Sequence, residues 1–146
     1  MEAANNTAAW RETTLHSTCE VSACINSLID ALAPLDFGER DLFGIRLALE
    51  EAIVNGIKHG NRNDPTKAVQ IRHQITDTEF LIEITDEGRG FDPDGVPDPL
   101  APENLQRPGG RGVFLMRHYM TWVSYNERGN CVTMCRRRAP SPPLAG

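Results

Sequence analysis

The feature that most constrains the fold is a long helical period between Glu39 and His59. Its apolar residues recur at intervals of three and four positions: Leu42, Ile45, Leu49, Ile53 and Ile57. This spacing places their side chains on one face of an α-helix, and Gly60 follows as an end signal. A long helix with one apolar face must be covered by a second layer, so the rest of the chain has to supply one.

The flanking segments predict that second layer. Ser17 or Thr18 can cap a shorter helix that ends at Pro34. A third helix is expected at about Gly112 to Met120. Period-two segments predict strands at 10–17, 68–75, 80–85, 122–125 and 131–137. The order of these elements predicts an α+β two-layer sandwich, with a mostly antiparallel sheet and helices on one face.

Length and composition predict one folded domain, since 146 residues with 40% hydrophobic content suffice for a core. We expect that domain to span residues 10–138, between a flexible N-terminus (1–9) and a flexible proline-rich tail (139–146). The segment 91–111 is rich in proline and lacks a helical or strand period. A structureless segment of this length is typical of a lid or a binding loop.

Charge and hydropathy exclude several classes of protein. A net charge of −5 and a pI near 5.3 argue against a nucleic-acid surface. No apolar stretch approaches the roughly 20 residues of a membrane span, and the N-terminus does not resemble a signal peptide, so we expect a cytoplasmic protein. The cysteines lack zinc-ligand spacing and are expected to be buried thiols in a reducing compartment: Cys19, Cys24, Cys131 and Cys135.

The long helix carries the first candidate site residues. Glu51, Asn55 and His59 are spaced four apart and therefore share one face of a regular α-helix. A carboxylate such as Glu51 can act as a general base, and the amide oxygen of Asn55 is a suitable ligand for Mg²⁺. This pattern alone is weak, because it occurs by chance on many surface helices.

A second candidate stretch ends the strand at 80–85. Asp86 follows that strand and precedes Gly88 and Gly90, so a carboxylate is presented at the sheet edge beside permissive backbone. It could accept a hydrogen bond from an exocyclic amine. The alternative is an ordinary strand-ending turn.

A third stretch places glycines before the last helix. Gly109, Gly110 and Gly112, with the backbone of Val113, can approach an anion at the positive end of that helix. Arg107 and Arg111 are candidates to neutralise a terminal phosphate. The stretch is not a P-loop, since no Gly-Lys-Ser/Thr follows, and it is not a dinucleotide fingerprint.

Together these stretches resemble the GHKL ATP-binding superfamily and, within it, the small anti-sigma factor serine/threonine kinases, over about residues 10–137. The resemblance implies a Bergerat-type α/β sandwich that binds ATP under a mobile lid. It implies that Glu51 is the base, Asn55 the magnesium ligand and Asp86 the residue that reads the adenine amino group. The motif Gly110–Arg111–Gly112 corresponds to the hinge of the lid. Where the family often has Gly-Thr in the last hairpin, this chain has Gly129 and Asn130.

The resemblance implies an ATP-dependent kinase that phosphorylates an anti-anti-sigma (STAS-type) protein, holds a sigma factor and forms a possible homodimer. The alternative is a non-catalytic module that binds ATP and a protein partner, although such a module would not need Glu51. A plain ATPase is a third reading, but the larger superfamily members rely on transducer domains for which this chain has no room.

Overall fold

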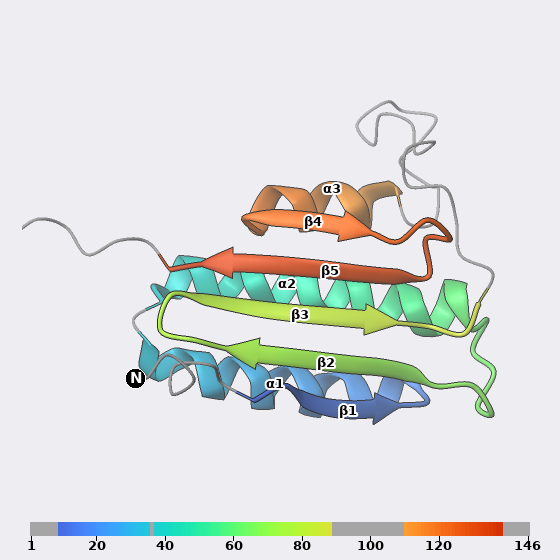
Figure 1. The fold of residues 1–146 in the computed structure, drawn as a ribbon. Coiled ribbons are helices and arrows are strands. Elements are labelled where there is room, and N and C mark those ends of the chain that lie inside the picture. The colour runs from blue at the N-terminus through green and yellow to red at the C-terminus, as the bar shows by residue number, and fades with distance from the viewer. Residues whose placement is uncertain (1–8, 36, 89–109, 139–146) are drawn as a thin grey trace, which may run out of the picture.

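The fold is built on a five-stranded sheet in the order β1-β2-β3-β5-β4, with every neighbouring pair antiparallel (Figure 1). The structure is a computed structural model that describes residues 9–35, 37–88 and 110–138. The strands are β1 (Arg11–Leu15), β2 (Val69–Ile75), β3 (Glu79–Thr85), β4 (Trp122–Tyr125) and β5 (Cys131–Arg137). The predicted antiparallel sheet is therefore confirmed.

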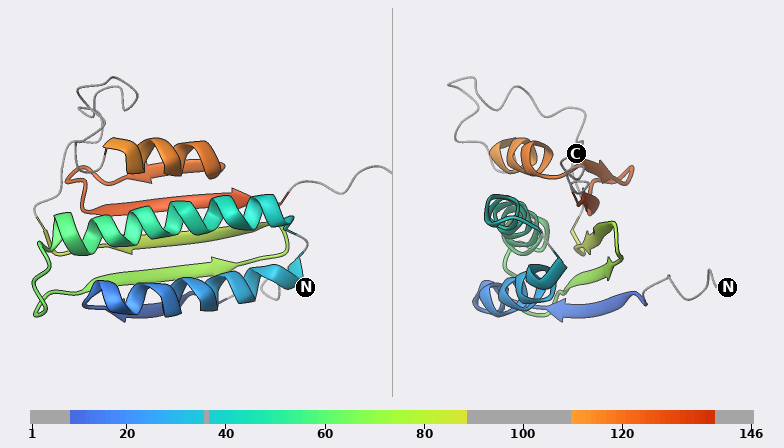
Figure 2. Two further views of the ribbon diagram at one scale, coloured as in Figure 1. Left: turned by 180° about the vertical axis from the view of Figure 1, so that it is seen from behind. Right: turned by 90° about the vertical axis from the view of Figure 1, so that its left-hand side faces the viewer.

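The helices lie on one face of this sheet, as Figure 2 shows from behind and from the end. They are α1 (Val21–Leu32), α2 (Glu39–Asn55) and α3 (Gly110–Tyr119). The opposite face of the sheet carries none of these three helices. The predicted α+β two-layer sandwich is confirmed.

The core lies between the two layers. On β3, Phe80, Ile82 and Ile84 are buried while the residues between them are only partly buried, as alternation along a strand requires. They meet the apolar stripe of α2, where Ile45 and Leu49 are fully buried. Burying one such side chain stabilises the fold by roughly 1.5–3 kcal/mol, so this interface fixes α2 against the sheet.

Two glycines allow α2 and α3 to pack closely. A Cβ on Gly44 would overlap the ring of Tyr119, and a Cβ on Gly112 would meet the side chains of Glu51 and Asn55. Since the later residues of α3 meet the earlier residues of α2, the two helices run antiparallel. The start of α3 is thereby held beside the end of α2.

The observed boundaries differ from the predicted ones at several places. The α-helical part of the second helix ends at Asn55, and residues 56–60 form a π turn in which Asn61 N donates to Gly56 O, five residues back, at 2.8 Å. His59 lies in that turn and is exposed, so the regular α-helical spacing on which its predicted alignment with Glu51 and Asn55 rests ends at Asn55.

Other boundaries moved by a few residues. The first strand is shorter than predicted, and Pro34 lies in a 3₁₀ turn (Ala33–Leu35) that continues α1. The last helix begins at Gly110 instead of Gly112, so residues 110–111 of the predicted lid are helical. The remainder of the predicted lid, most of the N-terminal segment and the tail from residue 139 lie outside the described residues. None of the helices in the described ranges is long and apolar enough to cross a membrane.

Candidate active site

The first and third candidate stretches meet where α2 ends. Glu51 and Asn55 are half-buried in the last turns of α2. A Cβ on Gly112 would lie 2.7 Å from Asn55 Nδ2 and 3.0 Å from Glu51 Oε2. Only glycine leaves both side chains in place, so the glycine-rich stretch is packed directly on the proposed base and metal ligand.

The second stretch reaches the same helix end from the sheet. Asp86 directly follows β3, and a Cβ on Gly60 would overlap its carboxylate. A Cβ on Gly88 would overlap the backbone carbonyl of Gly60, and a Cβ on Gly56 would lie 3.6 Å from Asp86 Cβ. The π turn therefore has glycines wherever the turn after β3 approaches it. All three candidate stretches converge around residues 51–60.

Glu51 and Asn55 have polar groups available for a ligand. Within the described part of the chain, neither side chain makes a hydrogen bond or an ion pair. A half-buried carboxylate and amide without partners are costly unless a ligand or water satisfies them. The amide oxygen of Asn55 is the type of hard oxygen donor that Mg²⁺ takes, so the residues fit a magnesium-bound ligand.

Asp86, by contrast, is held by its neighbours. Its backbone N donates to Asn130 O at 2.9 Å, and Asn130 Nδ2 donates to Asp86 O at 3.1 Å. Gly88 N donates to Asp86 Oδ1 at 2.8 Å. Burial raises the pKa of Asp86, and the Gly88 N–H and the charge of Arg128 oppose that rise. The carboxylate thus has a fixed position, with Oδ2 making none of these hydrogen bonds.

Asn130 stands where the resembling family often has threonine, and its amide is used within the protein. Besides its bond to Asp86 O, Asn130 Oδ1 accepts from Asn126 Nδ2 at 2.7 Å. Asn126 Oδ1 also accepts from the backbone N–H groups of Asn130 and Cys131. The tip of the β4–β5 hairpin is thereby connected to Asp86.

Asn61 is a further site residue that the sequence did not reveal. Only 3% of it is exposed. Its Nδ2 donates to Ala68 O at 3.0 Å, and its Oδ1 accepts from Glu87 N at 2.7 Å. It therefore ties the π turn to the start of β2 and to the turn after β3. Its position after a helix-ending glycine resembles any turn asparagine, so the sequence carried no signal of this role.

The remaining candidate residues lie at the start of α3 or outside the described ranges. The first backbone N–H groups of α3, from Gly110 to Val113, have no acceptor within the helix and carry its positive end. Val113 is 3% exposed, so only its backbone is suited to contact a ligand. Gly90, Arg107 and Gly109 lie outside the described residues.

Comparisons with known proteins agree with this geometry. Residues 16–136 match the model of the histidine kinase-like ATPase domain. The chain is 30% identical over 134 residues to serine/threonine-protein kinase BtrW of Bordetella bronchiseptica, covering 84% of this chain and 94% of that protein. It is 31% identical over 113 residues to an anti-sigma F factor of Clostridium botulinum, covering 73% and 78% of the two chains.

A further relative is serine-protein kinase RsbW of Staphylococcus epidermidis, 31% identical over 104 residues, which cover 66% of this chain and 65% of that protein. The domain match covers most of the chain, and the alignment with BtrW extends over nearly all of that kinase. The chain therefore belongs to the histidine kinase-like (GHKL) ATPase family and, within it, to the anti-sigma factor serine/threonine kinases.

Proposed function

We propose that this protein is an ATP-dependent serine/threonine kinase that acts as an anti-sigma factor in the cytoplasm and phosphorylates an anti-anti-sigma protein of the STAS type. The observation that carries the proposal is the packing of Gly112 on Glu51 and Asn55, directly beside the turn that holds Asp86. The printed names of the relatives support the kinase and anti-sigma roles.

The described residues supply distinct parts of an ATP site. Asp86 would accept a hydrogen bond from the adenine amino group through its carboxylate. The free N–H groups at the start of α3 would bind phosphate oxygens, and Gly112 lets this end of the helix pack against Glu51 and Asn55. Asn55 would hold Mg²⁺, which neutralises charge on the transferred phosphate when bound. We propose that Arg107 or Arg111 contacts the terminal phosphate.

In this proposal Glu51 is the general base for phosphoryl transfer. Its carboxylate would take the proton from a serine or threonine hydroxyl of the partner as that oxygen attacks the γ-phosphorus. The bond from the γ-phosphorus to the bridging oxygen breaks, and ADP leaves with the electron pair. Glu51 has no other partner in the described structure, so its carboxylate is available for this proton.

The partners and surroundings are part of the proposal. We propose that a sigma factor is the held client, that the protein forms a homodimer, and that it does not contact nucleic acid directly, in keeping with its net charge of −5. The cysteines of the described residues are free thiols, which fits a reducing compartment. Cys135 is buried as predicted, whereas Cys19 is exposed, so the prediction of a buried thiol is wrong there.

Calorimetric titration of ATP, with and without Mg²⁺, tests the nucleotide site. We expect the wild type to bind ATP with a magnesium-dependent gain, and we expect Asn55→Ala to lose that gain. Asn26→Ala, which changes an exposed asparagine on α1, is the matched control. Absence of ATP binding by a folded wild type would refute the ATP site and, with it, the kinase.

Transfer of labelled γ-phosphate to purified STAS-domain proteins of the same cell tests the kinase itself. We expect a serine or threonine of one such protein to be labelled. ATP binding without labelling of any of them would favour the non-catalytic binding module.

A further inference from the structure

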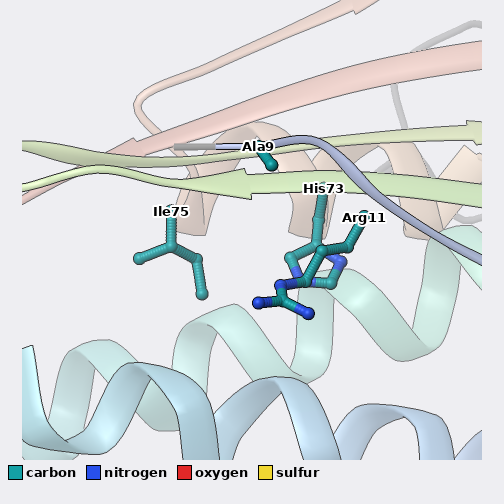
Figure 3. Close-up of a pocket in the computed structure, with 4 residues that line it drawn as sticks. All are labelled: Ala9, Arg11, His73 and Ile75. Atoms are coloured by element: carbon teal, nitrogen blue, oxygen red, sulfur yellow. The ribbon is translucent and has the colours of Figure 1, made fainter. Parts of the chain in front are cut away.

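A small cavity opens on the helix side of the sheet, away from the candidate active site. Its volume is about 240 Å³, and it is lined by Ala9, Arg11, His73 and Ile75 (Figure 3). Ile75 ends β2, whereas Val69 begins that strand and packs near Gly56 beneath the active site. The cavity therefore lies at the opposite end of β2 from the candidate ATP site.

A guanidinium and an imidazole converge on this cavity. Arg11 and His73 are direct partners in the antiparallel register of β1 and β2, and Figure 3 shows both side chains pointing toward the helical layer. Burial and the charge of Arg11 lower the pKa of His73. The imidazole is therefore neutral at neutral pH, with one ring N–H that can still donate a hydrogen bond, and the Arg11 guanidinium supplies the positive charge for an anion bound between the two side chains.

Neither side chain has a polar partner in the described part of the protein. His73 Nδ1 is buried without a hydrogen bond, and Arg11 makes no hydrogen bond or ion pair. Arg72, on the other face of the same strands, differs. It lies 3.3 Å from a Glu83 oxygen, 3.9 Å from a Glu12 oxygen and over the ring of Trp10. Glu12 and Glu83 are thus paired with Arg72 on the sheet face that carries none of the three helices, and not at the cavity.

We propose that this cavity binds a small organic acid. Its carboxylate would lie between the Arg11 guanidinium, whose planar fork matches two carboxylate oxygens, and the His73 imidazole. A short hydrocarbon portion would contact Ala9 and Ile75, which form the apolar part of the lining. The volume suits a molecule of a few carbon atoms, and this site is independent of the proposed kinase activity.

Nuclear magnetic resonance of the histidine rings during titration tests the site directly. We expect butyrate to shift the His73 ring signals saturably while the exposed His118 stays unchanged. Acetate should bind roughly tenfold more weakly because it lacks two methylene groups, and phosphate should bind more weakly than butyrate. Equal affinities for all three anions would overturn the proposed ligand class.

Variants of Arg11 test whether butyrate binds in this cavity. Arg11→Gln should weaken butyrate binding at least about tenfold, as expected for loss of a charge-assisted pair. Arg11→Lys keeps the positive charge but not the planar guanidinium, so its butyrate affinity should lie between those of the wild type and Arg11→Gln. Arg40→Gln, at an exposed position at the start of α2, is the matched control. Unchanged binding in folded Arg11→Gln would overturn the proposal.

The carboxylate could belong to a free acid or to an acidic side chain of a protein. Glutamate blocked at both its amino and carboxyl ends separates these sources, since only its side-chain carboxylate is free. Tighter binding of butyrate supports a free acid as the ligand, and tighter binding of blocked glutamate supports a protein side chain in the same site. A failure of His73 to respond to either compound would overturn the carboxylate site.

Discussion

The two halves of the candidate active site are built in opposite ways. In the helical half, Glu51 and Asn55 are held by the backbone of α2 and by contact with Gly112, and their polar groups have no partners in the described structure. In the turn half, Asp86 is fixed by hydrogen bonds from Gly88 and to and from Asn130. One half presents free polar groups, and the other presents a carboxylate already in position.

Under the proposed roles, this difference separates chemistry from recognition. A base and a metal ligand must change partners during a reaction, so they benefit from a rigid helix and free polar ends. A residue that recognises the adenine ring must hold its position before the ligand arrives, because preorganisation reduces the entropy lost on binding. The two halves should therefore respond differently to substitution.

Glu51→Gln should have the largest effect. The amide cannot accept the hydroxyl proton, so we expect phosphoryl transfer to fall roughly 10²–10⁴-fold, while ATP affinity and the melting temperature stay near those of the wild type. Glu50→Gln changes the exposed neighbour on α2 and should leave transfer intact. Single-turnover transfer of labelled phosphate measures both. Retained transfer in Glu51→Gln would remove Glu51 from the role of base.

Alanine substitutions at Gly88 and Gly112 should affect the two halves of the site differently. A Cβ on Gly88 would overlap the backbone of Gly60, which cannot rotate away, so we expect Gly88→Ala to lower the free energy of unfolding by about 1–3 kcal/mol. A Cβ on Gly112 would come close to the ends of two side chains, Asn55 Nδ2 at 2.7 Å and Glu51 Oε2 at 3.0 Å, and these ends can move aside.

Gly112→Ala should therefore retain wild-type stability, because alanine also favours the helix, and lose magnesium-dependent ATP binding. Urea unfolding and calorimetry on the same preparations test the pair. If Gly112→Ala binds ATP normally, the glycine stretch is a packing contact and not part of the site.

Asn61→Ala should destabilise the turn half of the site, because it removes the hydrogen bonds that hold the turn after β3 in place. The change leaves the Glu87 N–H and the Ala68 carbonyl without their buried partner, so we expect a loss of about 1–3 kcal/mol in the free energy of unfolding. ATP affinity should fall as well, because Glu87 is adjacent to Asp86. Asn26→Ala, at an exposed position, is the control. An unchanged ATP affinity would show that Asp86 is positioned without Asn61.

Local patterns predicted most of the fold and the helical half of the site. The stripe from Leu42 to Ile57 and the alternation in β3 are repeated short-range signals, so the layers followed from them. The glycine motifs also marked the contacts at Gly88 and Gly112, although not which atoms they would touch. These contacts join residues that are far apart in the chain, and a single sequence does not state such distances.

The sequence failed where backbone geometry departs from a regular period. The regular α-helix ends at Asn55, so the spacing that related His59 to Glu51 does not hold across the π turn at residues 56–60. Gly60 marked the end of the helix, but nothing in Gly-Ile-Lys-His-Gly indicated a π turn. Asn61 looked like a turn residue because its partners, Ala68 and Glu87, are defined only by the tertiary fold. The Arg11–His73 cavity likewise depends on the register of β1 and β2.

Asp86→Asn should have the smallest effect on stability, and this effect should depend on pH. Burial raises the pKa of Asp86 above its ordinary value, so the folded protein takes up this proton more readily than the unfolded chain. The ionised carboxylate therefore reduces stability at neutral pH, and this reduction disappears as the pH falls through the raised pKa. The asparagine variant should be as stable as the wild type at neutral pH, or slightly more stable.

ATP binding should show the opposite dependence, because the proposed hydrogen bond from the adenine amino group needs the ionised carboxylate of Asp86 as its acceptor. Wild-type affinity should decline on acidification at a higher pH than an ordinary aspartate would give, and Asp86→Asn should bind ATP more weakly and without that step. Calorimetry of both proteins across the acidic range, at constant Mg²⁺ and ionic strength, measures the difference. Identical pH profiles would mean that Asp86 does not read the adenine, and the fixed half of the site would then serve only to shape the turn.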